Sequence, residues 1–136
     1  MYYEIRLKVN KVDENTGDEK EVKEHFITDV ELFSEAEAKG LELYASDNMG
    51  CDVFAISRSN IIEIVNGKEE GQHFFKATVI DEQVDDKGVV KELKYYNLVA
   101  AKDLKEAYSI MEKHLSQGLS DMRLDGIVKT KILDVI

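Results

Sequence analysis

The sequence predicts an α+β fold built from two tandem β-hairpin–α–β repeats with pseudo-twofold symmetry. Three observations lead to this prediction: the chain repeats itself, alternating apolar residues mark strands, and each copy contains one capped helical segment. A shift of 71 positions places residues 59–65 on residues 130–136, and a shift of 72 places Tyr2-Tyr3 on Phe74-Phe75. A repeat of this length indicates two copies of one supersecondary unit, each unable to bury its apolar face alone.

The first repeat, residues 1–65, opens with a predicted hairpin. Its first strand alternates polar residues with Tyr3, Ile5, Leu7 and Val9, the period of a half-buried strand. Residues 13–19 form a polar turn containing a glycine, and a second strand follows over residues 22–30. The long antiparallel hairpin is the first element of the predicted unit.

A helix and a strand complete the first repeat. Ser34 and Glu37 have the spacing of a capping box, in which each side chain bonds the backbone amide of the other residue. Apolar residues then recur at three- and four-residue spacings up to Tyr44, and the helix is expected to end near residues 47–50. One long strand over residues 53–65 follows.

The second repeat, residues 73–136, gives the same order. Strands are predicted over residues 74–84 and 90–101, a helix capped by Asp103 and Glu106 over residues 103–117, and a final strand over residues 122–136. Residues 66–72 form a joint too short to separate two free domains, so residues 1–136 are expected to form one domain. We expect a mostly antiparallel sheet of strands from both halves with two helices packed on one face; two small sheets are the alternative.

The composition bounds the function. The net charge of −10 argues against nonspecific binding to duplex nucleic acid or anionic membranes. Residues 1–70 carry 8 basic and 17 acidic side chains, which fits either ordinary solubility or an acidic face for a basic partner. The single cysteine, Cys51, cannot form an intrachain disulfide, and no apolar run approaches the length of a membrane span, so a cytoplasmic location without a membrane partner is expected.

Sequence motifs for catalysis are missing. The chain has no glycine-rich phosphate loop, no paired cysteine or histidine metal motif and no nucleophile elbow. His114 lies on an apolar helix stripe, which favours a packed histidine over a metal ligand. We therefore predict no catalytic residue, no cofactor and no metal.

One group of residues has a pattern that suggests binding. Neighbouring residues in a strand point to opposite faces, so each aromatic doublet should place one ring outside the core, beside basic residues. Such a face could stack single-stranded bases. The alternatives are that the rings cap a sheet edge, pack beneath the hairpins or fill a dimer contact. The predicted face consists of Tyr2, Arg6, Lys8, Arg58, Phe74, Lys76 and Lys129.

The segments ELFSEAEA at residues 31–38 and KILDVI at residues 131–136 resemble an uncharacterised family, a domain of unknown function whose members come from gut bacteria and their phages. The resemblance covers the whole chain but rests on structural motifs: an opening aromatic strand, a capped helix and an acidic-aliphatic last strand. It implies a compact intracellular protein carried on mobile elements, and it supplies no catalytic residues. Ile136 stands where an aromatic residue is more usual, which affects packing only.

These observations favour a non-catalytic interaction or assembly module that binds a protein partner or a second copy of itself. The alternative is a single-stranded nucleic-acid-binding protein that uses the aromatic and basic face. An enzyme is the third hypothesis, and it would require a pocket with paired polar groups between the two halves.

Overall fold

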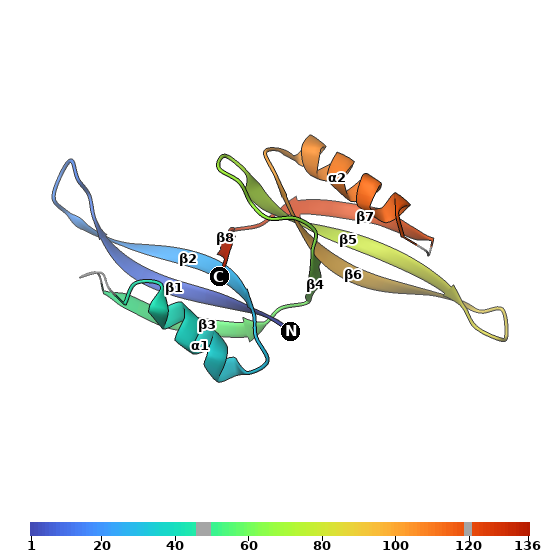
Figure 1. Ribbon diagram of the computed structural model, residues 1–136, viewed down its shortest axis with the longest axis horizontal. Helices are drawn as coiled ribbons and strands as arrows, with labels where there is room; N and C mark the ends of the chain where they lie inside the picture. Colours follow the sequence, from blue (N-terminus) through green and yellow to red (C-terminus); the bar gives the residue numbers. More distant parts are fainter. Residues whose placement is uncertain (46–49, 119–120) are drawn as a thin grey trace. The chain divides into compact units, whose positions relative to one another are not determined.

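The computed structural model of the chain describes residues 1–45, 50–118 and 121–136. The first helix ends at Glu42, earlier than the end predicted near residues 47–50, most of which lie outside the described residues. The described residues form the predicted tandem β-β-α-β order with two helices (Figure 1). The first half contains β1 (Tyr2–Val12), β2 (Glu19–Asp29), α1 (Phe33–Glu42), β3 (Cys51–Arg58) and β4 (Ile61–Ile64). The second half contains β5 (His73–Val84), β6 (Val90–Ala101), α2 (Leu104–Ser116), β7 (Met122–Lys129) and β8 (Ile132–Val135).

The strands form two four-stranded sheets, which confirms the α+β class and the alternative of two small sheets. The first sheet has the order β3-β1-β2-β8 and the second the order β4-β6-β5-β7. In each sheet the hairpin strands and the strand after the helix pair antiparallel, while the short fourth strand pairs parallel to its neighbour. Both sheets are therefore mixed, and they share one topology.

The long final strand predicted for each repeat is wrong, because each divides into two strands that belong to different sheets. The amide of Ser59 donates to the carbonyl oxygen of Tyr2 (2.8 Å), and that of Thr130 donates to the carbonyl oxygen of Phe74 (3.0 Å). After each of these bonds the chain leaves its own sheet. β4 then joins the second sheet and β8 joins the first. The residues before and after Ser59 and Thr130 are both rich in apolar side chains, because both strands of each pair pack in a sheet. The hydropathy pattern therefore does not reveal that the chain passes from one sheet to the other.

Because β4 and β8 each pair with the sheet of the other half, the two compact units of the chain do not coincide with the two repeats. Unit 1 consists of Met1–Ser59 with Lys131–Ile136, and unit 2 consists of Asn60–Thr130. Residues 66–72, expected to join the repeats, instead link β4 to β5 within unit 2. There the side-chain amide of Asn66 bonds both the carbonyl oxygen and the amide of Ala100 (2.9 and 2.7 Å). Asn66 thus extends the edge pairing of β4.

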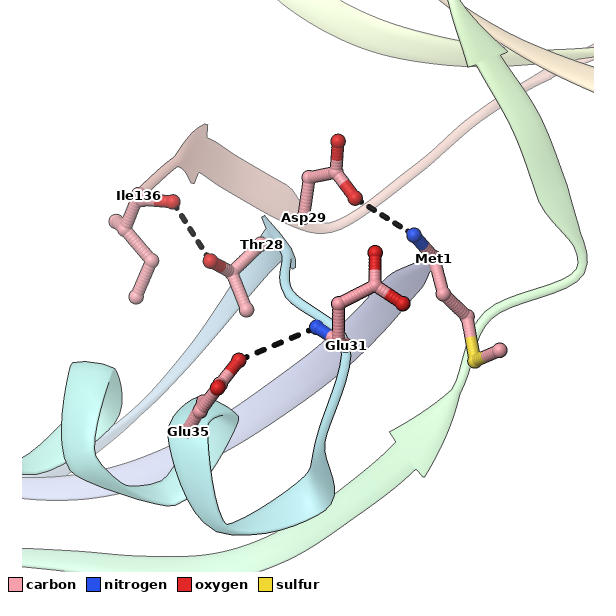
Figure 2. A network of polar contacts seen from close by, with 6 residues as sticks. All are labelled: Met1, Thr28, Asp29, Glu31, Glu35 and Ile136. Carbon is pink, nitrogen blue, oxygen red and sulfur yellow. Dashed lines mark hydrogen bonds and ion pairs between the residues drawn. The ribbon is translucent and has the colours of Figure 1, made fainter.

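Polar contacts hold β8 against β2 in unit 1 (Figure 2). The amide of Ile136 donates to the carbonyl oxygen of Ile27 (2.9 Å), and the Thr28 hydroxyl donates to the carbonyl oxygen of Ile136 (2.8 Å). Ile132 at the start of β8 is buried. Residues 131–136 are therefore an integral part of unit 1.

One helix packs on one face of each sheet (Figure 1). In unit 1, α1 approaches the sheet at Gly40, where an added Cβ would lie 3.0 Å from Cγ2 of Ile5. The 71-residue shift places Met111 at this position in unit 2, where Met111 shares a buried cluster with Ala77, the counterpart of Ile5. A small residue on the helix thus faces a large one on the sheet in unit 1, and the sizes are reversed in unit 2. No helix in the described part of the chain is long and apolar enough to cross a membrane.

The helix caps of the two units differ. In α2 the predicted cap is confirmed: Asp103 accepts a hydrogen bond from the amide of Glu106 (2.8 Å), and the Glu106 carboxylate accepts one from the amide of Lys102 (3.3 Å). The Ser34 capping box of α1 is wrong, because α1 begins earlier and its N-cap is Leu32, which has no side-chain bond.

The returning carboxylate of the cap is nevertheless present in unit 1. Glu35, the counterpart of Glu106, accepts a hydrogen bond from the amide of Glu31 (3.2 Å; Figure 2). Unit 1 therefore retains one half of the capping box, and only the N-cap side chain is missing.

Replacing Leu32 with aspartate should stabilise the protein. Leu32 is exposed and occupies the N-cap position that Asp103 fills in α2, so the substitution supplies a missing acceptor without removing core packing. The expected gain is about 1 kcal/mol in the free energy of unfolding, measured by urea denaturation. Asp103→Leu should cost a similar amount, and Ser34→Ala should have little effect. A larger loss from Ser34→Ala than from Asp103→Leu would contradict this assignment of the caps.

Candidate functional site

The face of the first sheet that α1 does not cover gathers positively charged side chains. Residues alternate between the two faces of a strand, so Arg6 and Lys8 in β1 project away from the helix. Lys23 in β2 lies directly opposite Lys8. Lys131, from the segment before β8, lines the same hollow as Arg6 and Lys23. We name this surface the basic face, and it consists of Arg6, Lys8, Lys23, Lys131 and the aromatic residue Phe54.

A β-bulge directs Phe54 onto the basic face. The pairing of β1 with β3 shifts register between Arg6 and Leu7, which leaves Phe54 in β3 without a partner in the ladder. Bulges of this kind redirect side chains. The ammonium nitrogen of Lys8 lies 5.0 Å from the centroid of the Phe54 ring, and that of Lys23 lies 5.9 Å away, both within range of a cation–π interaction.

The Phe54 ring forms one wall of a hollow of about 320 Å³ in unit 1. Phe54 is 39 % exposed, so its side chain is accessible to a ligand. The hollow is lined by Arg6, Lys23, Glu24, His25, Phe54, Lys131 and Leu133. The carboxylate of Glu24 is already engaged, because it accepts hydrogen bonds from the Tyr44 hydroxyl and from Lys11 (3.3 Å to the latter).

The cations of the basic face form no ion pair with the described residues. Arg6, Lys8, Lys23 and Lys131 have no carboxylate within 4.0 Å in the described part of the chain. The chain carries 28 acidic side chains, so four neighbouring cations without an ion pair are a local exception to its charge. The basic face thus carries four cations that no ion pair among the described residues neutralises, and Glu4, Glu21 and Asp52 lie on the same side of the sheet.

Beside this patch, His25 and Glu4 form a half-buried pair. Nε2 of His25 lies 2.9 Å from a carboxylate oxygen of Glu4. The contact with His25 holds the pKa of Glu4 below its ordinary value of 4.5, against the opposing effect of burial. In unit 2 the counterparts of these two residues are Lys76 and Tyr96, which form a cation–π contact at 4.5 Å. A carboxylate–imidazole pair at this position is therefore particular to unit 1.

Replacing Glu4 with glutamine should make stability less dependent on pH in the acid range. Folding lowers the pKa of Glu4, so its carboxylate stabilises the protein above the unfolded pKa near 4.5, and this contribution is lost as the pH falls through the folded pKa. The Tm of Glu4→Gln should lie below that of the wild type at neutral pH, and the difference should shrink towards acid pH. Thermal denaturation followed by circular dichroism measures both values, and a constant difference would contradict the assignment.

The structure brings together only part of the face predicted from the sequence. Arg6 and Lys8 lie on the basic face, and Tyr2 is on the same side of β1. Arg58 pairs with Tyr3, so its side chain is on the helix side of the first sheet. Arg58 therefore does not belong to the same surface as Arg6 and Lys8.

The remaining predicted residues belong to unit 2 and do not form a stacking platform there. Phe74 is only 1 % exposed. Lys129 pairs with Phe75, which belongs to the core cluster beneath α2, while Lys76 lies on the opposite side of β5 and contacts Tyr96. Arg58 and Lys129 occupy equivalent positions in the two sheets, as predicted, but both lie on the helix side of their sheets.

Sequence reasoning missed Phe54, Lys23 and Lys131. A regular alternation places Phe54 and Ile56 on one face of a strand, and the bulge breaks that alternation. The repeat contained a usable signal, because a shift of 71 places Phe54 on Asp125. In unit 2 the ladder shifts register at the same place, leaving Asp125 unpaired. An exposed carboxylate at this position in one copy indicates that the position does not face the core.

The described residues contain no group of three or more His, Cys, Asp or Glu side chains placed to hold a metal ion. The chain is thus an α+β protein with two mixed sheets and one basic, aromatic face. The sequence model of a family described as a domain of unknown function (DUF4494) matches residues 1–136. The chain belongs to this family. No curated protein and no solved structure matches the chain.

Proposed function

We propose that the protein is a non-catalytic interaction module and that its partner is a single strand of nucleic acid, bound at the basic face. The observation that carries this proposal is the group of four cations without ion pairs around the exposed ring of Phe54. Cations contact the phosphates of a strand, and an aromatic ring stacks on a base of any sequence.

The charge of the rest of the chain favours a single strand over a duplex. A duplex presents a wide, stiff and highly charged surface, which the net charge of −10 repels. A flexible strand needs to approach only the basic face. Its unstacked bases also expose the ring surface that Phe54 requires.

Phe54→Leu should weaken binding of a short fluorescent oligothymidine, measured by anisotropy at low salt. Leucine keeps the side chain apolar but removes the ring, and loss of one stacked base costs roughly 1–3 kcal/mol, or about 5- to 150-fold in Kd. Arg6→Ala and Lys8→Ala should each reduce the slope of log K against log salt by about 0.7. Lys105→Ala, on α2 of unit 2, is the charge-matched control and should leave binding unchanged.

Two results would overturn this proposal. One is the lack of binding at tens of micromolar protein, and the other is equal binding by wild type and Phe54→Leu. If the partner is an acidic protein segment, polyglutamate will compete at the basic face and the Phe54→Leu effect will be small. If the partner is a second copy of the chain, sedimentation will show a dimer that the cation variants dissociate.

The predicted cytoplasmic location and the predicted link to phages and mobile elements of gut bacteria belong to this proposal. Single-stranded nucleic acid is an intermediate of replication and transfer in such elements, so the two predictions are consistent. The genes that neighbour this one test the link, because replication or transfer genes are expected there.

A further inference from the structure

Unit 2 contains a second hollow, on the side of its sheet that α2 covers. Its volume is about 450 Å³, within the range of roughly 300–1,000 Å³ that small-molecule sites occupy. The side chains come from β4, β5, β6, α2 and the start of β7, and all of them belong to unit 2. The walls are mostly apolar and include Val79, Leu115 and Met122.

A buried amide oxygen without a hydrogen-bond partner lies in the wall of this hollow. Asn97 is 5 % exposed, and its side-chain oxygen accepts no hydrogen bond in the described part of the chain. Buried polar atoms in proteins nearly always have a partner, and an unpaired one is costly. Asn97 lies opposite Ala77 of the core cluster, so its side chain is on the helix side of the sheet.

Two further residues supply polar and aromatic groups at the hollow. Tyr95 lies two residues before Asn97 on β6 and therefore projects to the same face. His114 at the end of α2 lies with its Nε2 3.3 Å from a carboxylate oxygen of Glu63 on β4. Both members of this pair are partly exposed, and both line the hollow.

The corresponding region of unit 1 shows that the fold does not require these groups. The 71-residue shift places Phe26 at the position of Asn97 and Leu43 at that of His114. Tyr44, the counterpart of Leu115, donates its hydroxyl hydrogen to Glu24, the counterpart of Tyr95. The same scaffold thus accepts apolar side chains and an internally satisfied polar pair, whereas unit 2 keeps an unpaired amide oxygen beside an open space.

We propose that this hollow binds a small, planar, uncharged aromatic heterocycle that donates an N–H to the side-chain oxygen of Asn97, the class to which nucleobases belong. The apolar walls accept the ring, Tyr95 offers it a stacking surface, and the donor satisfies the buried oxygen. The site is separate from the basic face and does not depend on it.

The proposal is tested with the full chain and two closely matched probes. Theophylline carries one ring N–H, and caffeine carries a methyl group on that nitrogen. We expect theophylline and adenine to raise the Tm and to shift the NMR signals of the Asn97 side-chain amide, whereas caffeine should do neither. No effect from theophylline and adenine at millimolar concentration, or an equal effect from caffeine, would overturn the proposal.

Two variants separate a ligand role of Asn97 from a structural one. Asn97→Leu removes the unpaired oxygen, so the unliganded protein should keep or raise its Tm while theophylline binds about tenfold more weakly or worse. Leu115→Tyr, which introduces the residue of unit 1, should fill the hollow and abolish binding. A lower Tm for Asn97→Leu, or unchanged binding in either variant, would refute the assignment. Phe54→Leu should bind theophylline normally, whatever its effect on oligothymidine.

Discussion

A fragment comprising residues 60–130 should fold cooperatively, and a fragment of equal length comprising residues 66–136 should be much less stable. The first fragment contains all the strands of unit 2, whereas the second lacks β4 and carries β8, which has no sheet to join. The repeat seen in the sequence and the folded unit therefore have different boundaries, and the experiment decides between them.

The expected difference between the fragments is large. Without β4, β6 loses its parallel partner and the buried side chain of Ile61, whose transfer from water is worth about 1.5–3 kcal/mol. The hydrogen bond from the amide of Val65 to the carbonyl oxygen of Leu98 is lost as well, because Val65 precedes this fragment. For a domain of this size such a loss lowers the Tm by roughly 10 °C or more.

Thermal denaturation followed by circular dichroism, with amide signal dispersion in NMR spectra, measures the difference between the two fragments. Equal stability of the two fragments, or a cooperative transition only in residues 66–136, would show that β4 does not belong to unit 2.

The reversed packing of helix and sheet in the two units predicts a strong coupling between residues 5 and 40. Gly40→Met should destabilise unit 1, because even a Cβ at Gly40 meets Ile5 at 3.0 Å; overpacking typically costs about 1–3 kcal/mol. Ile5→Ala should cost about 2–5 kcal/mol, because it leaves a cavity in the core.

The double variant should be more stable than Ile5→Ala alone. It reproduces the pair that unit 2 contains, Ala77 with Met111, and the added methionine side chain fills the space that Ile5 leaves. Urea denaturation of the four proteins gives the coupling free energy, expected at about 1–3 kcal/mol. Gly40→Ala is the control, since it adds only the Cβ. Additive effects of the two substitutions would show that they do not share a packing site.

The sequence contained enough information for the elements but not for their pairing. The alternation in residues 3–9 and the Asp103 cap are local signals, and both elements are present as predicted. The long strands over residues 53–65 and 122–136 failed because an apolar pattern specifies that a segment is buried but not which sheet buries it. The breaks at Ser59 and Thr130 depend on backbone bonds to Tyr2 and Phe74, far away in the sequence.

The basic face shows the same limit at the level of single residues. Arg6 and Lys8 were found because β1 alternates regularly, whereas Phe54 depends on a bulge that shifts its strand by one position. Lys131 reaches the face only because β8 joins the first sheet. Asn97 could not be predicted from the sequence, because a missing hydrogen bond to its buried side-chain oxygen is visible only in the folded structure.

The position of β8 also determines the order in which the protein is completed during synthesis. The Thr28 hydroxyl bonds the backbone of a residue 108 positions later, whereas all of unit 2 lies within one continuous segment. During synthesis, one edge of β2 in unit 1 therefore has no β8 strand to pair with until residues 131–136 have been made. Unit 2 needs no residue after Thr130 to complete its sheet.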